Sequence, residues 1–192
     1  MALIKDSRIY FIYILFCIGF PGLLPAQSGK PEEYLNGLKF LGLNNTAAAE
    51  SCFASSVARH KDADSFYQLG KIQEAKKTYN ARNEALESLK QAALRKPGNL
   101  TYRLDYLRLF EEFAIFSAIN GYKTLTDEFK NTPVPWIRLG EINLKGYNEY
   151  KDSRKIGKEE DPDYDFDLSE TAKQDFLEAQ TCFMNALKID SA

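Results

Sequence analysis

Histidine, cysteine and tryptophan are scarce in this sequence of 192 residues, which contains one His, three Cys and one Trp. Zinc sites need several Cys or His ligands close together, and His60 has no such companions. No serine or cysteine motif has a recognisable base partner, and no glycine-rich loop follows a strand. The sequence therefore predicts a protein that is not an enzyme and that holds neither a metal ion nor another cofactor.

An excess of charge of one sign is also missing. The chain has 25 basic and 27 acidic residues, which gives a formal net charge of −2 at pH 7. A surface for nucleic acid or for anionic lipid would need a basic stripe. Nucleic-acid binding is therefore not expected.

Long apolar runs are lacking as well. The run Ile9–Phe20 is almost wholly apolar, but it falls short of the roughly 20 residues that a membrane-spanning helix needs. Lys5 and Arg8 precede it, and Ala26 supplies a small residue at a plausible cleavage point. The pattern predicts a signal peptide over residues 1–26, with no stable membrane span after its removal.

Two alternatives remain for this N-terminal segment. It could be retained as an anchor, or Cys17 could carry a lipid, although the bulky Phe16 before it disfavours lipid attachment. The signal peptide predicts an exported protein, with the periplasm or cell envelope of a bacterium as the expected location. Secretion is the alternative location.

A pattern of small, large and small side chains recurs along the chain, with spacings of 4 and 3 positions. The copies are Ala49-Phe53-Ser56, Ala85-Leu89-Ala92, Ala118-Tyr122-Leu125 and Ala179-Phe183-Ala186. The first three copies start at nearly equal intervals, and the interval before the last copy is almost twice as long, which implies an insertion. The third copy is the weakest, because Asn120 and Gly121 interrupt it. A helical stripe repeated about every 34 residues predicts stacked helical hairpins.

Helical periodicity dominates the chain, and no convincing pair of strands is present. The expected helices cover residues 31–41, 47–60, 65–79, 81–95, 101–118, 122–130, a segment from 136, and 175–189. Grouped in pairs, they give a domain over residues 30–192 with repeats at about 30–62, 63–98, 99–132 and 133–192. The short connections predict that successive helices are antiparallel neighbours.

The chain resembles tetratricopeptide-repeat proteins at several motifs. These are Trp136-x-x-Leu139-Gly140, the similar Phe66-x-x-Leu69-Gly70, the triads, and Pro97 at the family's terminal proline. The resemblance implies an all-α, right-handed solenoid of about four antiparallel hairpins. Independently of the family, Gly70 and Gly140 are expected where two helices cross closely, because glycine lacks a Cβ atom. The first and third repeats depart most from the family pattern.

The resemblance also implies that the first helices of the hairpins line a concave groove that binds another protein. Carried over by position, the groove residues are Tyr34, Leu38, Tyr67, Lys71, Arg108, Glu112, Ile137, Glu141 and Lys145. Mixed charge with aromatic side chains suits an extended peptide or a helix as the ligand. The alternative is that some of these side chains pack between repeats.

The insertion at about 146–168 is strongly polar. Its basic first part is followed by acids with two aromatic residues among them: Asp161, Asp163, Tyr164, Asp165, Phe166 and Asp167. It is either a solvated loop or a second partner-binding segment, with aromatic anchors and steering acids. A calcium loop of the hand type would need Gly and Glu where Phe166 and Ala172 stand. Asp167 and Glu170 fit a capping box that opens the last helix.

The prediction is therefore an exported interaction module or scaffold that binds a segment of another protein in the groove, through the insertion, or through both. The alternative is a self-associating subunit of an envelope assembly. That alternative rests on an uncapped last helix, whose apolar side carries Phe176, Leu177, Phe183 and Leu187. Cys52 and Cys182 are expected as separate thiols, because a stacked array places them in distant hairpins. An intermolecular disulfide is the alternative for them.

Overall fold

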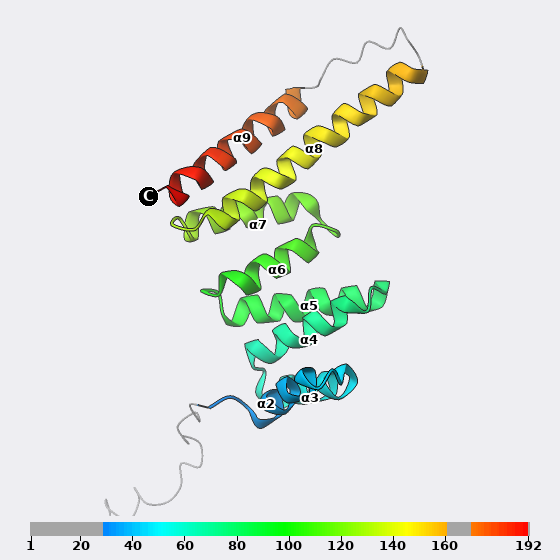
Figure 1. Cartoon of the computed structure of the whole chain (residues 1–192), viewed down its shortest axis with the longest axis vertical. Coiled ribbons are helices and arrows are strands. Elements are labelled where there is room, and N and C mark those ends of the chain that lie inside the picture. The colour runs from blue at the N-terminus through cyan, green and yellow to red at the C-terminus, as the bar shows by residue number, and fades with distance from the viewer. Residues whose placement is uncertain (1–28, 161–169, 192) are drawn as a thin grey trace, which may run out of the picture.

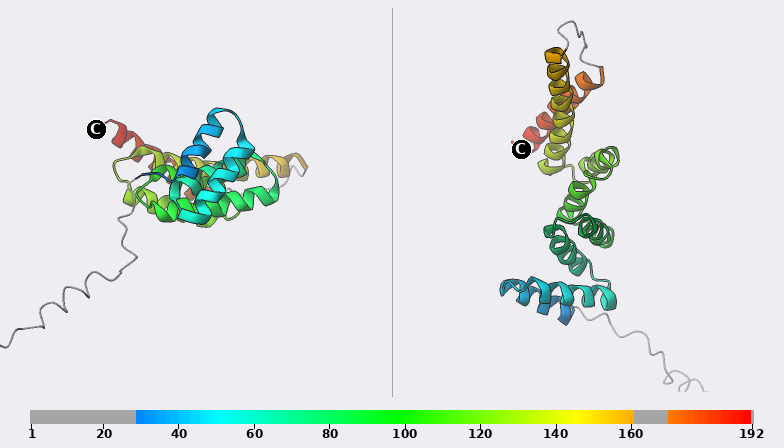
Figure 2. Two further views of the ribbon diagram at one scale, coloured as in Figure 1. Left: turned by 90° about the horizontal axis from the view of Figure 1, so that it is seen from below. Right: turned by 90° about the vertical axis from the view of Figure 1, so that its right-hand side faces the viewer.

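The computed structural model describes residues 29–160 and 170–191, and within them every regular element is an α-helix. The helices are α2 (Glu32–Gly42), α3 (Thr46–His60), α4 (Ala63–Ala75), α5 (Tyr79–Arg95), α6 (Leu100–Phe110), α7 (Ile115–Glu128), α8 (Pro133–Glu160) and α9 (Glu170–Asp190). Successive helices form the hairpins α2–α3, α4–α5, α6–α7 and α8–α9, stacked in one elongated array with α2 and α9 at opposite ends (Figures 1 and 2). The predicted all-α solenoid of four hairpins is confirmed.

Side-chain caps fix the starts of α3, α4, α5 and α6. The backbone amides of Ala48, Ser65, Ala81 and Tyr102 donate to Asn45, Asp62, Thr78 and Asn99 at 3.1, 2.9, 3.3 and 3.2 Å. These caps satisfy amides that have no partner inside the helix. They also correct one boundary. The predicted helix over 65–79 ends at Ala75, because Lys77 adopts a left-handed φ of 57° and Thr78 opens the next helix.

Three hairpins cross at a glycine of the first helix, against the central side chain of a triad on the second. A Cβ atom on the glycine would lie 2.6 Å from Phe53 at Gly37, 2.9 Å from Leu89 at Gly70 and 2.8 Å from Phe183 at Gly140. At these distances a Cβ atom would force the facing side chain or the helix to shift, so the crossings favour glycine. The close approach expected at Gly70 and Gly140 is therefore present.

The third hairpin differs from its prediction. Its turn spans residues 111–114, whereas Asn120 and Gly121 lie inside α7. Leu107 occupies the glycine position of the first helix, and Gly121 of the second helix admits it, since a Cβ on Gly121 would lie 2.5 Å from Leu107 Cδ2. The glycine that resembled a turn signal is thus a packing residue. Because α7 continues through it, Tyr122 is fully buried with the rest of its triad.

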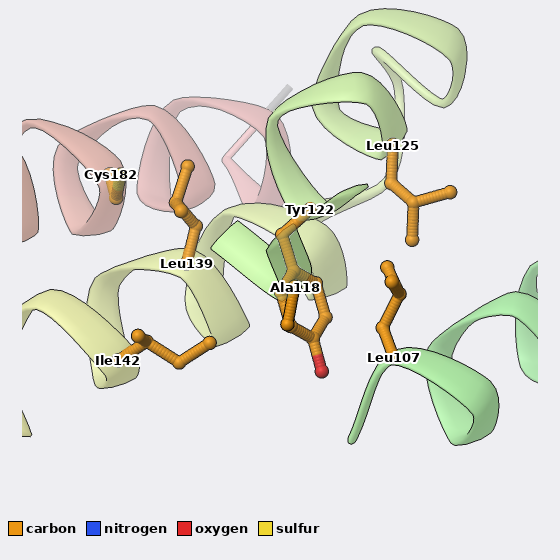
Figure 3. Packing of buried hydrophobic residues seen from close by; sticks show 7 residues of the cluster. All are labelled: Leu107, Ala118, Tyr122, Leu125, Leu139, Ile142 and Cys182. Carbon is orange, nitrogen blue, oxygen red and sulfur yellow. The ribbon is translucent and has the colours of Figure 1, made fainter. Parts of the chain in front are cut away.

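Tyr122 anchors the largest apolar cluster, which joins α6, α7, α8 and α9 (Figure 3). Its ring packs among buried aliphatic side chains that include Leu107, Leu125 and Leu139. Its hydroxyl points away from this cluster in Figure 3 and donates to Glu111 Oε1 at 2.6 Å. Burial, followed by this hydrogen bond, raises the pKa of the Tyr122 phenol far above its ordinary value. The side chain therefore holds the third and fourth hairpins together without leaving its polar atom unpaired.

The insertion is largely helical, which corrects its description as a loop. Helix α8 continues to Glu160, and α9 begins at Glu170 rather than near residue 175. The rings of Tyr147 and Phe176 lie 5.0 Å apart, and Ala172 is completely buried. The two helices therefore form a paired extension beyond the other hairpins (Figure 1).

Both cysteines in the described chain are free thiols, with Cys182 buried and Cys52 half-buried. Burial is the main cause that raises the pKa of the Cys182 thiol. None of the described helices is long and apolar enough to cross a membrane. The predicted signal peptide over residues 1–26 lies outside the described residues.

Candidate partner-binding surfaces

The predicted groove residues Tyr67, Lys71 and Arg108 lie in one polar network between α4 and α6. The Tyr67 hydroxyl donates to Asp105 Oδ2 at 2.7 Å, and Lys71 Nζ lies 3.4 Å from the same oxygen. Arg108 donates to Glu74 Oε1 at 2.6 Å, and Lys71 lies 3.3 Å from Glu74 Oε2. The two cations and two carboxylates alternate, so the network is neutral and each charge has a fixed neighbour. We call the face of α4 and α6 that carries this network, together with the side of α2 that carries Tyr34, the first-helix face.

A second polar cluster on the first-helix face surrounds Asp64, whose side chain is only 9 % exposed. Asp64 Oδ1 accepts from the Tyr102 hydroxyl at 2.6 Å and from Lys96 Nζ at 2.5 Å, and Asp64 Oδ2 pairs with Lys30. The rings of Tyr102 and Tyr67 stack at 4.3 Å with an angle of 18° between their planes. The stacked rings join the two clusters.

Burial raises the pKa values of the tyrosines on this face. Desolvation is the largest cause that raises the pKa of Tyr102 to about 12. Desolvation, and then the hydrogen bond to Asp105, raise the pKa of Tyr67 further. Desolvation also raises the pKa of Tyr34, whose ring packs against Phe53 with centroids 5.8 Å apart. All three phenols are protonated at neutral pH, and those of Tyr67 and Tyr102 donate to carboxylates.

The other predicted groove residues are not in this network. Glu112 lies in the turn after α6 and pairs with Arg82 of α5 at 2.7 Å. On α8, Glu141 pairs with Arg138 at 2.7 Å and Lys145 with Glu149 at 3.7 Å. Leu38 is exposed on α2, and Ile137 lines a pocket between α8 and α9. The structure thus brings three of the nine predicted groove residues together and distributes the rest along the array.

The insertion residues Asp161, Asp163, Tyr164, Asp165, Phe166 and Asp167 lie outside the described residues. The same holds for the capping box that was expected at Asp167. A partner-binding site at this position therefore stays a prediction from the sequence.

Two pockets that the sequence analysis missed lie between successive hairpins. A pocket of about 400 Å³ between α5, α6 and α7 is lined by Lys90, Leu94, Arg103 and Tyr106, among others. A pocket of about 410 Å³ between α7, α8 and α9 is lined by Lys123, Asp127, Trp136 and Leu139, among others. Each residue of the second set follows its counterpart in the first by the same number of positions, close to the repeat length. This constant offset was the signal that could have predicted the pockets.

A third pocket, of about 310 Å³, lies between the two helices of the last hairpin. We call it the α8–α9 groove, and its lining consists of Pro133, Ile137, Phe183, Ala186, Leu187 and Asp190. Most of these side chains are apolar, and Leu187 is 62 % exposed. Ile137, which was predicted to face a ligand, belongs to this surface.

Clustered metal ligands are absent from the part of the chain that the structure describes. Residues 29–160 and 170–191 contain no group of three or more His, Cys, Asp or Glu side chains placed to hold a metal ion. His60 lies at the end of α3 with Nε2 3.3 Å from Glu33 Oε2, and nearly half of its side chain is exposed. The surfaces described above are suited to contacts with another chain.

The fold is similar to that of solved repeat proteins. The structure of MamA superposes with a TM-score of 0.59 at 12% sequence identity, over 83% of this chain and 77% of that one. A tetratricopeptide repeat protein from Parabacteroides merdae ATCC 43184 gives a TM-score of 0.52 at 18% identity, over 82% of this chain and 62% of that one. The chain has a tetratricopeptide-repeat fold. No sequence profile of a protein family matches it, and no curated protein sequence is significantly similar.

Proposed function

We propose that this tetratricopeptide-repeat solenoid is an exported scaffold, which binds an extended segment of another protein on its first-helix face. The observation that carries the proposal is the network of Tyr67, Lys71 and Arg108, because both cations are partly exposed while carboxylates fix their positions. Guanidinium and ammonium groups have more donors than these contacts use. A peptide with backbone carbonyls or carboxylates would find donors already in place, at a small entropic cost.

The proposed location is the periplasm or cell envelope of a bacterium. Its support is the predicted signal peptide over residues 1–26, and secretion is the alternative. Fractionation of cells that express the full chain tests the location. Recovery of a shortened protein in the periplasmic fraction is expected, and recovery of the full-length chain in the cytosol would contradict export.

The binding experiment is a cross-linked pull-down from the native envelope fraction with the double variant Lys71→Ala/Arg108→Ala. We expect it to lose the partner that the wild-type protein recovers. The matched control is Lys39→Ala/Lys130→Ala, which removes two exposed positive charges outside the network and should keep the partner. Equal recovery by both variants would contradict binding on the first-helix face.

A variant lacking residues 147–167 belongs in the same experiment. If only this variant loses the partner, recognition lies in the α8–α9 extension and the acidic segment instead. Self-association is the alternative function, favoured by the exposed apolar side chains of α9: Phe176, Leu177, Met184 and Leu187. A mass in solution that rises with protein concentration would support it.

A further inference from the structure

Each of the first three hairpins of the array presents a groove in which the first helix of the next hairpin lies. The contact is made by two large apolar side chains three positions apart, which we call the docking pair. The docking pairs are Leu69 and Ile72 of α4, Tyr106 and Leu109 of α6, and Leu139 and Ile142 of α8. In α4 and α8 the pair consists of the residue before the crossing glycine and the second residue after it. In α6 the pair has the same positions relative to Leu107, which occupies the glycine position. One rule therefore describes all three contacts.

The α8–α9 groove repeats the surface that these docking pairs cover. Ile137 precedes its crossing glycine by the same number of positions as Tyr67 does. Phe183 matches Leu89 at the centre of the triad, and Leu187 matches Ala93 directly after it. In the α4–α5 hairpin, α6 covers these positions, so Leu89 is completely buried and packs against Leu109 of the docking pair. In the last hairpin Phe183 is half-buried and Leu187 is largely exposed. Among the described helices, none covers this groove.

A second copy of the chain does not supply a fitting helix through α2. Counted from the crossing glycine Gly37 by the same rule, the positions of the docking pair in α2 are Asn36 and Lys39. Both side chains are exposed and polar, so α2 offers no apolar pair for the groove. Packing the α2 of one molecule against the α8–α9 groove of another would bury an amide and an ammonium group without partners.

We propose that the α8–α9 groove binds an amphipathic α-helix of another protein, and that this helix carries a docking pair of large apolar residues three positions apart. The groove continues the series of interfaces already formed inside the array, and its apolar lining needs the same kind of occupant. This surface is distinct from the first-helix face of the proposed function.

Charge adds one further feature to the expected ligand. Lys71 faces Asp105, which immediately precedes the docking pair of α6, with a separation of 3.4 Å. In the last hairpin, Glu141 directly follows its crossing glycine, as Lys71 does in α4, and presents a carboxylate at the corresponding place. A Lys or Arg directly before the docking pair of the ligand is therefore favoured.

The test uses the full predicted mature chain and a fluorescently labelled synthetic peptide with the sequence of residues 62–77. This peptide contains the docking pair Leu69 and Ile72, which contacts Phe53 in the first hairpin, and the last hairpin has Phe183 at the matching place. Fluorescence anisotropy should show binding to the wild-type protein. The peptide variant Leu69→Asn/Ile72→Lys, which carries the pair found in α2, should bind at least tenfold more weakly.

Two protein variants locate the binding. Leu187→Glu should weaken the peptide at least tenfold, whereas Leu94→Glu should change it less than twofold, although the two leucines are 62 % and 63 % exposed. Both positions are at the surface, so circular dichroism should show both variants folded. The peptide variant Gln68→Lys should bind about two- to fivefold more tightly, and Glu141→Gln should remove that gain.

Three results would overturn the proposal. One is the absence of peptide binding by the wild-type protein, and another is equal binding by the Leu187→Glu variant or by the Asn/Lys peptide. The third is a dimer of the wild-type protein that Leu187→Glu converts to a monomer, since a second copy would then fill the groove.

Discussion

The helices of the second hairpin and those of the third both cross closely at a glycine, but the glycine lies on the first helix in one hairpin and on the second helix in the other. In α4–α5, Gly70 of the first helix admits Leu89 of the second, and in α6–α7, Gly121 of the second helix admits Leu107 of the first. Helices that cross this closely need one side chain and one gap, but either helix can supply the gap. A hairpin that lacks the Leu-Gly motif can therefore still belong to the array.

The first and last hairpins also differ in how well their grooves are covered, and this difference predicts the largest effect on stability. Phe53 is completely buried under α4, so Phe53→Ala should lower the free energy of unfolding by about 3–5 kcal/mol. Phe183 holds the same place in the last hairpin but is only half-buried, so Phe183→Ala should cost about 1–2 kcal/mol. Urea denaturation followed by circular dichroism measures both. Equal losses would show that the α8–α9 groove is covered in solution.

Ion pairs of a nearly buried and of an exposed carboxylate give a second comparison, with smaller expected losses of stability. Asp64→Ala would leave Lys30 and Lys96 without the nearly buried carboxylate that they share, at a cost of about 2–3 kcal/mol. Glu141→Ala removes an ion pair in which both side chains are about half exposed, so the loss should stay below about 0.5 kcal/mol. The midpoints of urea unfolding give both values. A similar loss for the two variants would mean that the Asp64 cluster contributes no more than a surface pair.

Substitution by alanine should affect stability differently at Gly70 and at Gly121. A Cβ on Gly70 would meet the backbone nitrogen of Leu89 at 3.2 Å as well as its side chain, so Gly70→Ala should cost about 1–3 kcal/mol. A Cβ on Gly121 would meet only the movable end of Leu107, and both residues line the pocket of about 400 Å³ into which that side chain can shift. The gain in helix propensity of about 1 kcal/mol then offsets most of the strain.

Thermal unfolding of the two alanine variants measures this difference. Gly121→Ala should lie within about 1 kcal/mol of the wild-type protein in either direction. If Gly121→Ala is the more damaging change, the third hairpin is packed as rigidly as the second. The comparison between the two glycines would then fail.

Sequence patterns predicted the fold wherever local signals and packing agree. The small–large–small stripes and Gly70 identify the same helices that the structure shows, because the close crossing needs those residues. Asn120-Gly121 was misleading because the pair is a strong turn signal, and only the contact with Leu107 shows that the helix continues. The polar insertion was misleading as well, since the aromatic contact between Tyr147 and Phe176 is not visible in its composition.

The candidate site was less predictable than the fold. Tyr67 and Lys71 contact the same residue, Asp105, which lies a whole repeat further along the chain, on the first helix of the next hairpin. Composition cannot show which charges neutralise each other across such a separation in sequence. The repeat offset can show it, because it identifies the residues that occupy equivalent places in successive hairpins.

The smallest expected effect concerns Asp175, where α9 passes Gly146 of α8. A Cβ on Gly146 would lie 3.2 Å from Asp175 Oδ2, so the carboxylate lies close against the α8 backbone. Desolvation, followed by repulsion from Glu178, raises the pKa of Asp175 above its ordinary value of 3.8. The folded protein then binds this proton more tightly than the unfolded chain, and the free energy of unfolding falls as the pH rises through and above that value.

Asp175→Asn should therefore stabilise the protein slightly at pH 7, by less than about 0.5 kcal/mol because solvent screens the group. The gain should disappear at about pH 3, where the carboxyl is protonated in both states. Melting temperatures at the two pH values measure it, with Asp152→Asn as a control at an exposed position of α8. A gain of the same size at both pH values would assign the effect to packing of the amide, and the ionisation of Asp175 would then not distinguish the last hairpin from the others.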